Sequence, residues 1–141
     1  MVFYDASAVV KWFLAEEERA DEVDRLRGEA RGAVSQLTEV ELVSAFARRH
    51  REGSISAEML QALIATSTEE LGSVVVLEMN QAVVGLARSL LLRHPLRAGD
   101  AVQLSSCLVL EERIQQPVQF LAFDQRLNEA AVREGLRLAL S

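Results

Sequence analysis

Short apolar runs alternate along this chain with longer segments of helical periodicity, and this alternation restricts its fold more than any other feature. Strands that alternate with helices favour a parallel sheet, because parallel strands need a crossover connection, which is usually a helix. The run Val74–Leu77 is almost entirely β-branched, which is typical of an interior or near-edge strand of a parallel sheet. We therefore expect an α/β protein, a three-layer α/β/α sandwich with a mostly parallel central sheet. The expected strands span residues 2–4, 33–35, 74–77, 118–123 and 136–140, and the expected helices span residues 7–14, 16–31, 37–51, 56–71, 80–93, 99–113 and 124–134.

Length and composition indicate one folded domain. The chain has 141 residues, of which 50% are hydrophobic and 26% are charged, and it contains no repeat or low-complexity tract. Cys107 is the only cysteine, so an intrachain disulfide is impossible and a reducing compartment is favoured. The first residues lack the pattern of a secretory signal, and no apolar run is long enough to cross a bilayer. We expect a single domain over residues 1–141, in the cytoplasm and without a membrane partner.

The charge balance argues against general attraction of a polyanion. Fifteen Lys and Arg residues against 21 Asp and Glu residues give a formal net charge of −6, so no overall positive field draws in nucleic acid. Lys11 is the only lysine, and the other fixed cations are arginines, whose planar guanidinium groups bind phosphate in a forked geometry. A nucleic-acid substrate would therefore have to be bound locally.

The helix expected over residues 37–51 carries apolar side chains at helical spacing. We predict that Val40, Val43, Phe46 and Ala47 face the core. Three arginines follow near the end of this helix, where positive charge suits the helix dipole.

Four acidic residues lie where the expected elements bring their ends together. Asp5 follows the first strand and Asp124 follows the fourth, and the carboxyl ends of parallel strands meet at one edge of a sheet. Asp100 and Glu41 fall in the first turns of helices, which begin at that same edge. We therefore expect the four carboxylates to share one crevice.

Carboxylates in one crevice repel one another unless a positive charge neutralises them. Hard divalent cations such as Mg²⁺ and Mn²⁺ prefer oxygen ligands and keep several of their waters. The acidic residues thus favour a divalent-metal site at this edge of the sheet.

Helix capping is the alternative explanation for the same acids. Asp5, Asp100 and Asp124 each suit an N-cap, and Thr38 with Glu41 matches a capping box. On this interpretation the chain is a non-catalytic α/β protein-binding module. Ser, Thr or Asn would cap equally well, however, so capping does not require four carboxylates at converging elements.

The segments around these acids carry a family resemblance. They are Val2–Lys11, Glu41–Phe46, Leu96–Leu104 and Phe120–Leu127. In this order and spacing, over nearly the whole chain, they resemble the successive motifs of PIN-domain ribonucleases, and most closely those of the VapC-type toxins of toxin–antitoxin pairs. The resemblance implies that the four acids correspond to the family's acidic quartet and that Ser7 corresponds to a hydroxyl position beside the first aspartate.

Two positions depart from the family pattern. Ala122 stands two residues before Asp124, where the family often has Thr or Ser, and Gln103 stands where a His is common. Neither change removes an expected metal ligand. The first removes a hydroxyl that would help to place Asp124.

The residues and the resemblance together predict a divalent-metal-dependent endoribonuclease. Asp5, Asp100 and Asp124 are expected to bind Mg²⁺ or Mn²⁺ directly or through water, and Glu41 to complete the shell or to take a proton from the attacking water. The resemblance further implies products with 5′-phosphate and 3′-hydroxyl ends, a homodimer, and a cognate VapB-type antitoxin. The apolar stripe Trp12–Leu14 is a candidate part of the antitoxin groove.

The expected substrate-binding residues are Ser7, Arg97 and Arg126. The two arginines neighbour Asp100 and Asp124 in the sequence, so they are placed to contact an RNA backbone. Lys11 is expected either to face the site or to lie at the surface.

Overall fold

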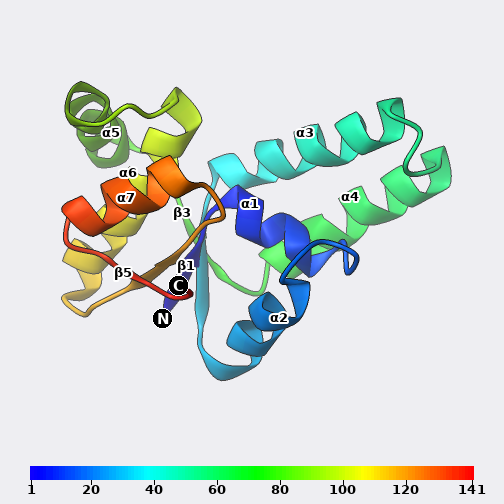
Figure 1. Ribbon diagram of the computed structural model, residues 1–141, viewed down its shortest axis with the longest axis horizontal. Helices are drawn as coiled ribbons and strands as arrows, with labels where there is room; N and C mark the ends of the chain where they lie inside the picture. The colour runs from blue at the N-terminus through cyan, green and yellow to red at the C-terminus, as the bar shows by residue number, and fades with distance from the viewer.

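A computed structural model describes residues 1–141 and contains one five-stranded sheet, in which all neighbouring strands are parallel (Figure 1). The strand order is β3-β2-β1-β4-β5, so β1 lies at the centre. The strands are β1 (Val2–Tyr4), β2 (Gly32–Ser35), β3 (Val75–Leu77), β4 (Gln119–Leu121) and β5 (Arg137–Leu138).

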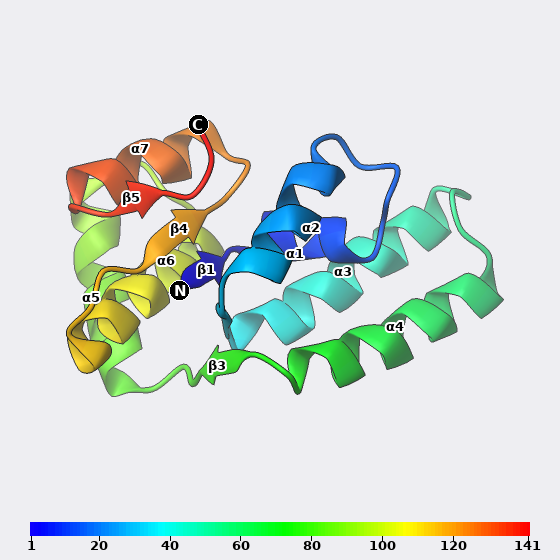
Figure 2. The same ribbon diagram turned by 90° about the horizontal axis from the view of Figure 1, so that it is seen from below.

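Seven helices cover the two faces of the sheet and confirm the predicted α/β/α layers. One face packs against α1 to α4 and the other against α5 to α7, and α3 and α4 lie side by side and extend beyond the sheet (Figure 2). The helices are α1 (Ala6–Val9), α2 (Ala20–Glu29), α3 (Leu37–Arg51), α4 (Ala57–Leu71), α5 (Gln81–Arg93), α6 (Ala98–Ile114) and α7 (Gln125–Arg133). No helix of the fold has both the length and the hydropathy that crossing a membrane requires.

The central strand explains why both faces of the sheet are apolar. Side chains alternate along a strand, so Val2 and Tyr4 join the core beneath α1 to α4, whereas Phe3 joins the core beneath α5 to α7. All three are completely buried. Burial on both faces requires continuous apolar strands, and the sequence has them.

Several elements are shorter than the sequence predicts. Strand β4 is confined to the three residues that pair with β1, and β3, predicted as interior or near-edge, lies at the sheet edge. The helix expected over residues 16–31 spans only Ala20–Glu29, because Arg19 adopts a left-handed conformation with φ of 65°. Lys11 does not lie at the surface, since it is buried and donates a hydrogen bond from Nζ to the carbonyl oxygen of Glu18 at 2.6 Å. Its Nζ also lies 4.5 Å from the centre of the Phe123 ring, and the alternative that it faces the site stays a prediction.

The prediction for the inward face of α3 was wrong in part. Phe46 is buried as predicted, but Val40 is 67% exposed and Val43 is 39% exposed. The buried positions are Thr38, Leu42 and Phe46, which recur every four residues. The sequence pattern misled because one member of the buried stripe is polar, while the exposed stripe carries two valines.

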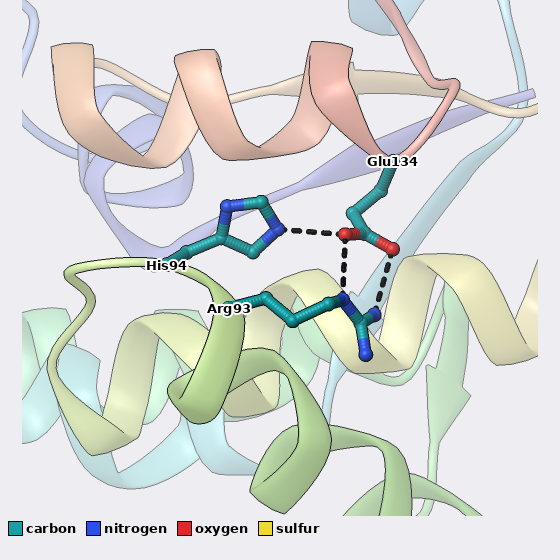
Figure 3. Close-up of polar contacts among 3 residues, drawn as sticks. All are labelled: Arg93, His94 and Glu134. Carbon is teal, nitrogen blue, oxygen red and sulfur yellow. Dashed lines mark hydrogen bonds and ion pairs between the residues drawn. The ribbon is translucent and has the colours of Figure 1, made fainter.

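An ionic cluster joins the ends of α5 and α7 (Figure 3). Arg93 donates two hydrogen bonds to the carboxylate of Glu134, at 2.9 and 3.3 Å, and His94 Nε2 lies 2.6 Å from Glu134 Oε2. His94 is buried and directly precedes the segment that leads into α6. The cluster therefore fixes the start of the connection that carries Arg97 and leads to Asp100 in the first turn of α6.

We expect that replacing Glu134 with Gln lowers the free energy of unfolding by about 1 kcal/mol at pH 7, because it removes the charge that Arg93 and His94 contact. Hydrogen bonding from Arg93 lowers the pKa of the Glu134 carboxyl below its ordinary value of 4.5 in the folded protein. The stabilising contribution is thus present above that value and is lost as the pH falls through the lowered pKa.

Urea titrations at several pH values measure this effect. The difference between wild type and Glu134→Gln should disappear once the pH falls below the lowered pKa of Glu134, and Glu112→Gln, at an exposed site, is the matched control. Equal stability of Glu134→Gln and wild type at pH 7 would contradict the role assigned to the cluster.

Candidate active site

Asp5 lies directly after the central strand and is the most buried of the four acids. Its side chain caps α1, and Oδ2 accepts hydrogen bonds from the backbone nitrogen of Ser7 at 3.0 Å and from Ser7 Oγ at 2.6 Å. Only 5% of the residue is exposed, and burial raises the pKa of Asp5 to about 6. The Ser7 hydrogen bonds oppose this rise, whereas repulsion by Glu41 and Asp100 adds to it.

Ser7 connects Asp5 to the segment that carries Asp124. Its hydroxyl donates to Asp5 and accepts a hydrogen bond from the backbone nitrogen of Phe123 at 3.0 Å. The ends of β1 and β4 are thereby tied together beside the two aspartates. The predicted contact of Ser7 with substrate stays a prediction, because both of these interactions are within the protein.

Asp124 also caps a helix. It follows β4 after two further residues, and Oδ1 accepts a hydrogen bond from the backbone nitrogen of Leu127 at 3.0 Å in the first turn of α7. Asp124 is exposed, and its second carboxylate oxygen has no hydrogen-bond partner within the chain. The capping interpretation is therefore correct for Asp5 and Asp124, but it accounts for only one oxygen of each.

The capping interpretation is wrong for the other two acids. Helix α3 has Gln36 as its N-cap, without a side-chain hydrogen bond, so Thr38 and Glu41 do not form the predicted capping box. Helix α6 has Arg97 as its N-cap, and Asp100 lies inside the first turn. Neither carboxylate is therefore itself an N-cap, although the backbone amide of the N-cap residue Arg97 acts on Asp100.

Glu41 is held by a contact that the sequence analysis did not predict. Gln103 donates a hydrogen bond from Nε2 to Glu41 Oε1 at 2.8 Å and a second to Thr38 Oγ1 at 3.0 Å. Burial raises the pKa of Glu41, the Gln103 hydrogen bond lowers it, and repulsion by Asp100 raises it. One feature of the sequence could have pointed to Gln103 as part of the site. It lies three residues after Asp100, which places both side chains on one face of α6.

The four carboxylates are electrostatically linked. Burial raises the pKa of Asp100, and Asp124 raises it further, while the backbone amide and the charge of Arg97 lower it. Asp100 and Glu41 in turn raise the pKa of Asp5. The acids therefore form a chain of mutual repulsion from Asp124 through Asp100 to Glu41 and Asp5.

The chemistry of this donor set fits a hard divalent cation. In Asp5, Glu41 and Asp124, one carboxylate oxygen accepts a hydrogen bond from the protein, and the other accepts none. Oxygen ligands with unneutralised negative charge are those that Mg²⁺ and Mn²⁺ prefer. No group of three or more His, Cys, Asp or Glu side chains is already gathered at a single point, however. The four residues thus fit a divalent cation by the chemistry and charge of their oxygen atoms.

A groove of about 700 Å³ opens beside two of the acids. Asp100 and Asp124 line it together with Arg97 and Arg126, and neither arginine forms an ion pair. Asp5 and Glu41 are not among its lining residues, which are Pro95, Arg97, Asp100, Phe123, Asp124, Gln125, Arg126 and Glu129. The groove combines unpaired cations with carboxylates, whereas Arg49 and Arg93 are already paired with glutamates.

The sequence matches the PIN domain family over residues 2–133, and the chain therefore belongs to this family. No curated protein matches the chain by sequence.

Solved structures share the fold at low sequence identity. The sarcin–ricin loop cleaving toxin VapC20 of Mycobacterium tuberculosis is 18% identical, with a TM-score of 0.67 over 92% of this chain and 95% of that one. VapBC2 of Rickettsia felis, solved bound to a DNA fragment from its promoter, is 12% identical, with a TM-score of 0.67 over 98% and 97%. A toxin–antitoxin complex from Klebsiella pneumoniae is 12% identical, with a TM-score of 0.64 over 89% and 88%. At these identities the likeness is one of fold.

We expect that Asp5→Asn stabilises the protein at neutral and alkaline pH. The folded state raises the pKa of Asp5 from 3.8 to about 6, so wild type loses stability as the pH rises through this range, because a buried charge forms. Asn keeps an oxygen that accepts from Ser7 and never ionises. The expected gain is about 2 to 3 kcal/mol at pH 8 and close to zero below about pH 4.

Chemical denaturation of both proteins without added metal, at pH 4, 6 and 8, measures this gain. A difference in unfolding free energy that does not change with pH, or a variant less stable than wild type at pH 8, would show that Asp5 is not a strained buried carboxylate.

Proposed function

We propose that this protein is a divalent-metal-dependent endoribonuclease that acts as the toxin of a toxin–antitoxin pair. The observation that carries the proposal is the chain of mutual repulsion among Asp5, Glu41, Asp100 and Asp124 in a member of the PIN domain family. Acidic residues that served only as caps would have no reason to lie close enough to destabilise one another's charged forms.

Asp5, Asp100 and Asp124 would hold Mg²⁺ or Mn²⁺, directly or through water. A divalent ion bound by these residues supplies an activated water and neutralises charge that develops on the phosphate oxygens. Ser7 and the Leu127 amide keep one oxygen each of Asp5 and Asp124 in place. Glu41 completes the ligand set or takes a proton from the attacking water.

The groove beside Asp100 and Asp124 would accept the RNA backbone. Arg97 and Arg126 are free to contact phosphates, because neither is paired with an acid of the chain. This local pair of cations compensates for the net charge of −6, which would otherwise repel RNA. Ser7, which lies beside Asp5, would add a polar contact near the scissile bond.

Two surfaces of the protein support the proposal that it binds other protein chains. Val40 and Val43 on α3 are exposed apolar residues, and they support a homodimer formed through this helix. Trp12 and Phe13 are half-buried near the acidic residues Glu16 and Glu18, which supports docking of the apolar helix and basic tail of a VapB-type antitoxin.

The proposal predicts RNA cleavage that depends on Mg²⁺ or Mn²⁺ and stops when EDTA is added. Asp5→Asn should eliminate the activity although the variant folds, and the products should carry 5′-phosphate and 3′-hydroxyl ends. Mapping of RNA ends after brief expression of wild type and Asp5→Asn, together with cleavage of the mapped RNA by purified protein, measures both expectations.

Cleavage that persists in EDTA would count against the proposal. If the protein is instead a non-catalytic binding module, its thermal stability should be indifferent to Mn²⁺, and no new RNA ends should distinguish wild type from Asp5→Asn.

We further expect that Arg97→Ala and Arg126→Ala each raise the KM for RNA by about threefold to tenfold and reduce the salt dependence of binding by about one ion, because each loses one phosphate contact. Arg113→Ala removes an exposed arginine at the far end of α6 and is the matched control. Equal KM values for all three variants would exclude this groove as the RNA site.

A further inference from the structure

Gln103 is a completely buried polar residue one helical turn after Asp100. Its Nε2 group spans the space between α6 and α3, where it donates to Thr38 Oγ1 at 3.0 Å and to Glu41 Oε1 at 2.8 Å. No other group of the chain donates a hydrogen bond to the Glu41 carboxylate. The position of Glu41 relative to α6 therefore depends on this one side chain.

Packing alone does not explain a glutamine at this position, because the oxygen of the same amide has no partner. Gln103 Oε1 is buried and has no hydrogen-bond partner. An unpaired buried acceptor costs stability, and Met would fill a similar volume without that cost. A residue retained only to fill the core would thus be better replaced by an apolar one.

The orientation of the amide follows from the charge of Glu41. Both hydrogens of Nε2 are used, one toward Thr38 and one toward Glu41. Rotating the amide by half a turn would set Oε1 against the carboxylate, so that two acceptors faced each other. Gln103 therefore presents only donors to this side, which suits an ionised Glu41.

The remaining oxygen of Glu41 lies beside the residue that precedes Asp100. A Cβ atom built on Gly99 would lie 3.5 Å from Glu41 Oε2. With Oε1 fixed by Gln103, Oε2 stays next to the start of α6, where the charges of Glu41 and Asp100 act on each other. Without the amide, this repulsion would favour movement of Glu41 away from the other acids.

We propose that Gln103 is a positioning residue that holds Glu41 against the repulsion of Asp100, so that the charge of Glu41 contributes to binding of the divalent cation. The inference rests on the proposed function, because it assigns a partner to one residue of that site. Thr38 completes the arrangement by accepting the second hydrogen bond of the amide.

The test compares wild type, Gln103→Met, Glu41→Ala and the double variant by calorimetric titration with Mn²⁺, by thermal unfolding, and by the kinetics of RNA cleavage. Gln103→Met should weaken Mn²⁺ affinity by about tenfold and lower kcat by a similar factor. The KM for RNA should change by less than about twofold, because no substrate contact is lost. The Tm should change little, because removal of the unpaired Oε1 offsets the loss of the two hydrogen bonds that Thr38 and Glu41 accept.

The double variant shows whether Gln103 acts through Glu41. If it does, Gln103→Met weakens Mn²⁺ affinity no further in the Glu41→Ala background. Ser106→Ala is the matched control, because Ser106 is a buried polar residue of α6 whose hydroxyl bonds only within its own helix.

Two results would overturn the inference. They are wild-type Mn²⁺ affinity in Gln103→Met, whatever its Tm, and a loss of affinity that is undiminished in the Glu41→Ala background. In each case cleavage by wild type would leave the proposed function standing. Absence of both Mn²⁺ binding and cleavage in wild type would instead overturn the proposed function and this inference with it.

Discussion

Repulsion among four carboxylates at one edge of a parallel sheet is the constraint to which the rest of this structure responds. The central position of β1 buries Asp5, and the starts of α3 and α6 bring Glu41 and Asp100 near it. The chain stabilises this arrangement with individual donors rather than with ion pairs: Ser7 for Asp5, Gln103 for Glu41, and a helix amide for Asp124. Each donor fixes one oxygen and leaves negative charge unneutralised, which is the arrangement that a cation site requires.

The layered fold could be predicted because the spacing of apolar residues along the sequence shows which faces of each helix and strand are buried. Runs buried on both faces identified the strands, and Asn80 and Asp124 correctly marked helix starts. Errors arose where tertiary contacts override local pattern. Helix α2 starts late because Arg19 is left-handed, and Lys11 bonds to the carbonyl of Glu18 directly before it. In α3, Thr38 is buried whereas the predicted Val40 and Val43 are exposed. The pattern of apolar residues cannot predict that a polar residue is buried, since the partner that satisfies it lies far away in the sequence.

The sequence predicts the acids of the candidate site, which stay a prediction, but it does not predict the side chains that hold them. Strand and helix ends indicated which carboxylates would come together, because the connectivity of a parallel sheet places those ends at one edge. The link from Gln103 to Glu41 crosses 62 residues, and no spacing rule connects them. The bridge from Ser7 to the Phe123 amide spans 116 residues. Such contacts depend on the exact approach of two elements, which only the three-dimensional structure gives.

The most direct test of this account is the position of a divalent cation in the folded protein. Crystals of wild type soaked in Mn²⁺ can be examined by anomalous diffraction, which locates the ion without assumptions about its ligands. The account predicts a peak among Asp5, Asp100 and Asp124, with at least one carboxylate oxygen about 2.0 to 2.2 Å from the metal. A crystal that contains no Mn²⁺ at this edge, or that binds it only elsewhere, would contradict the central claim.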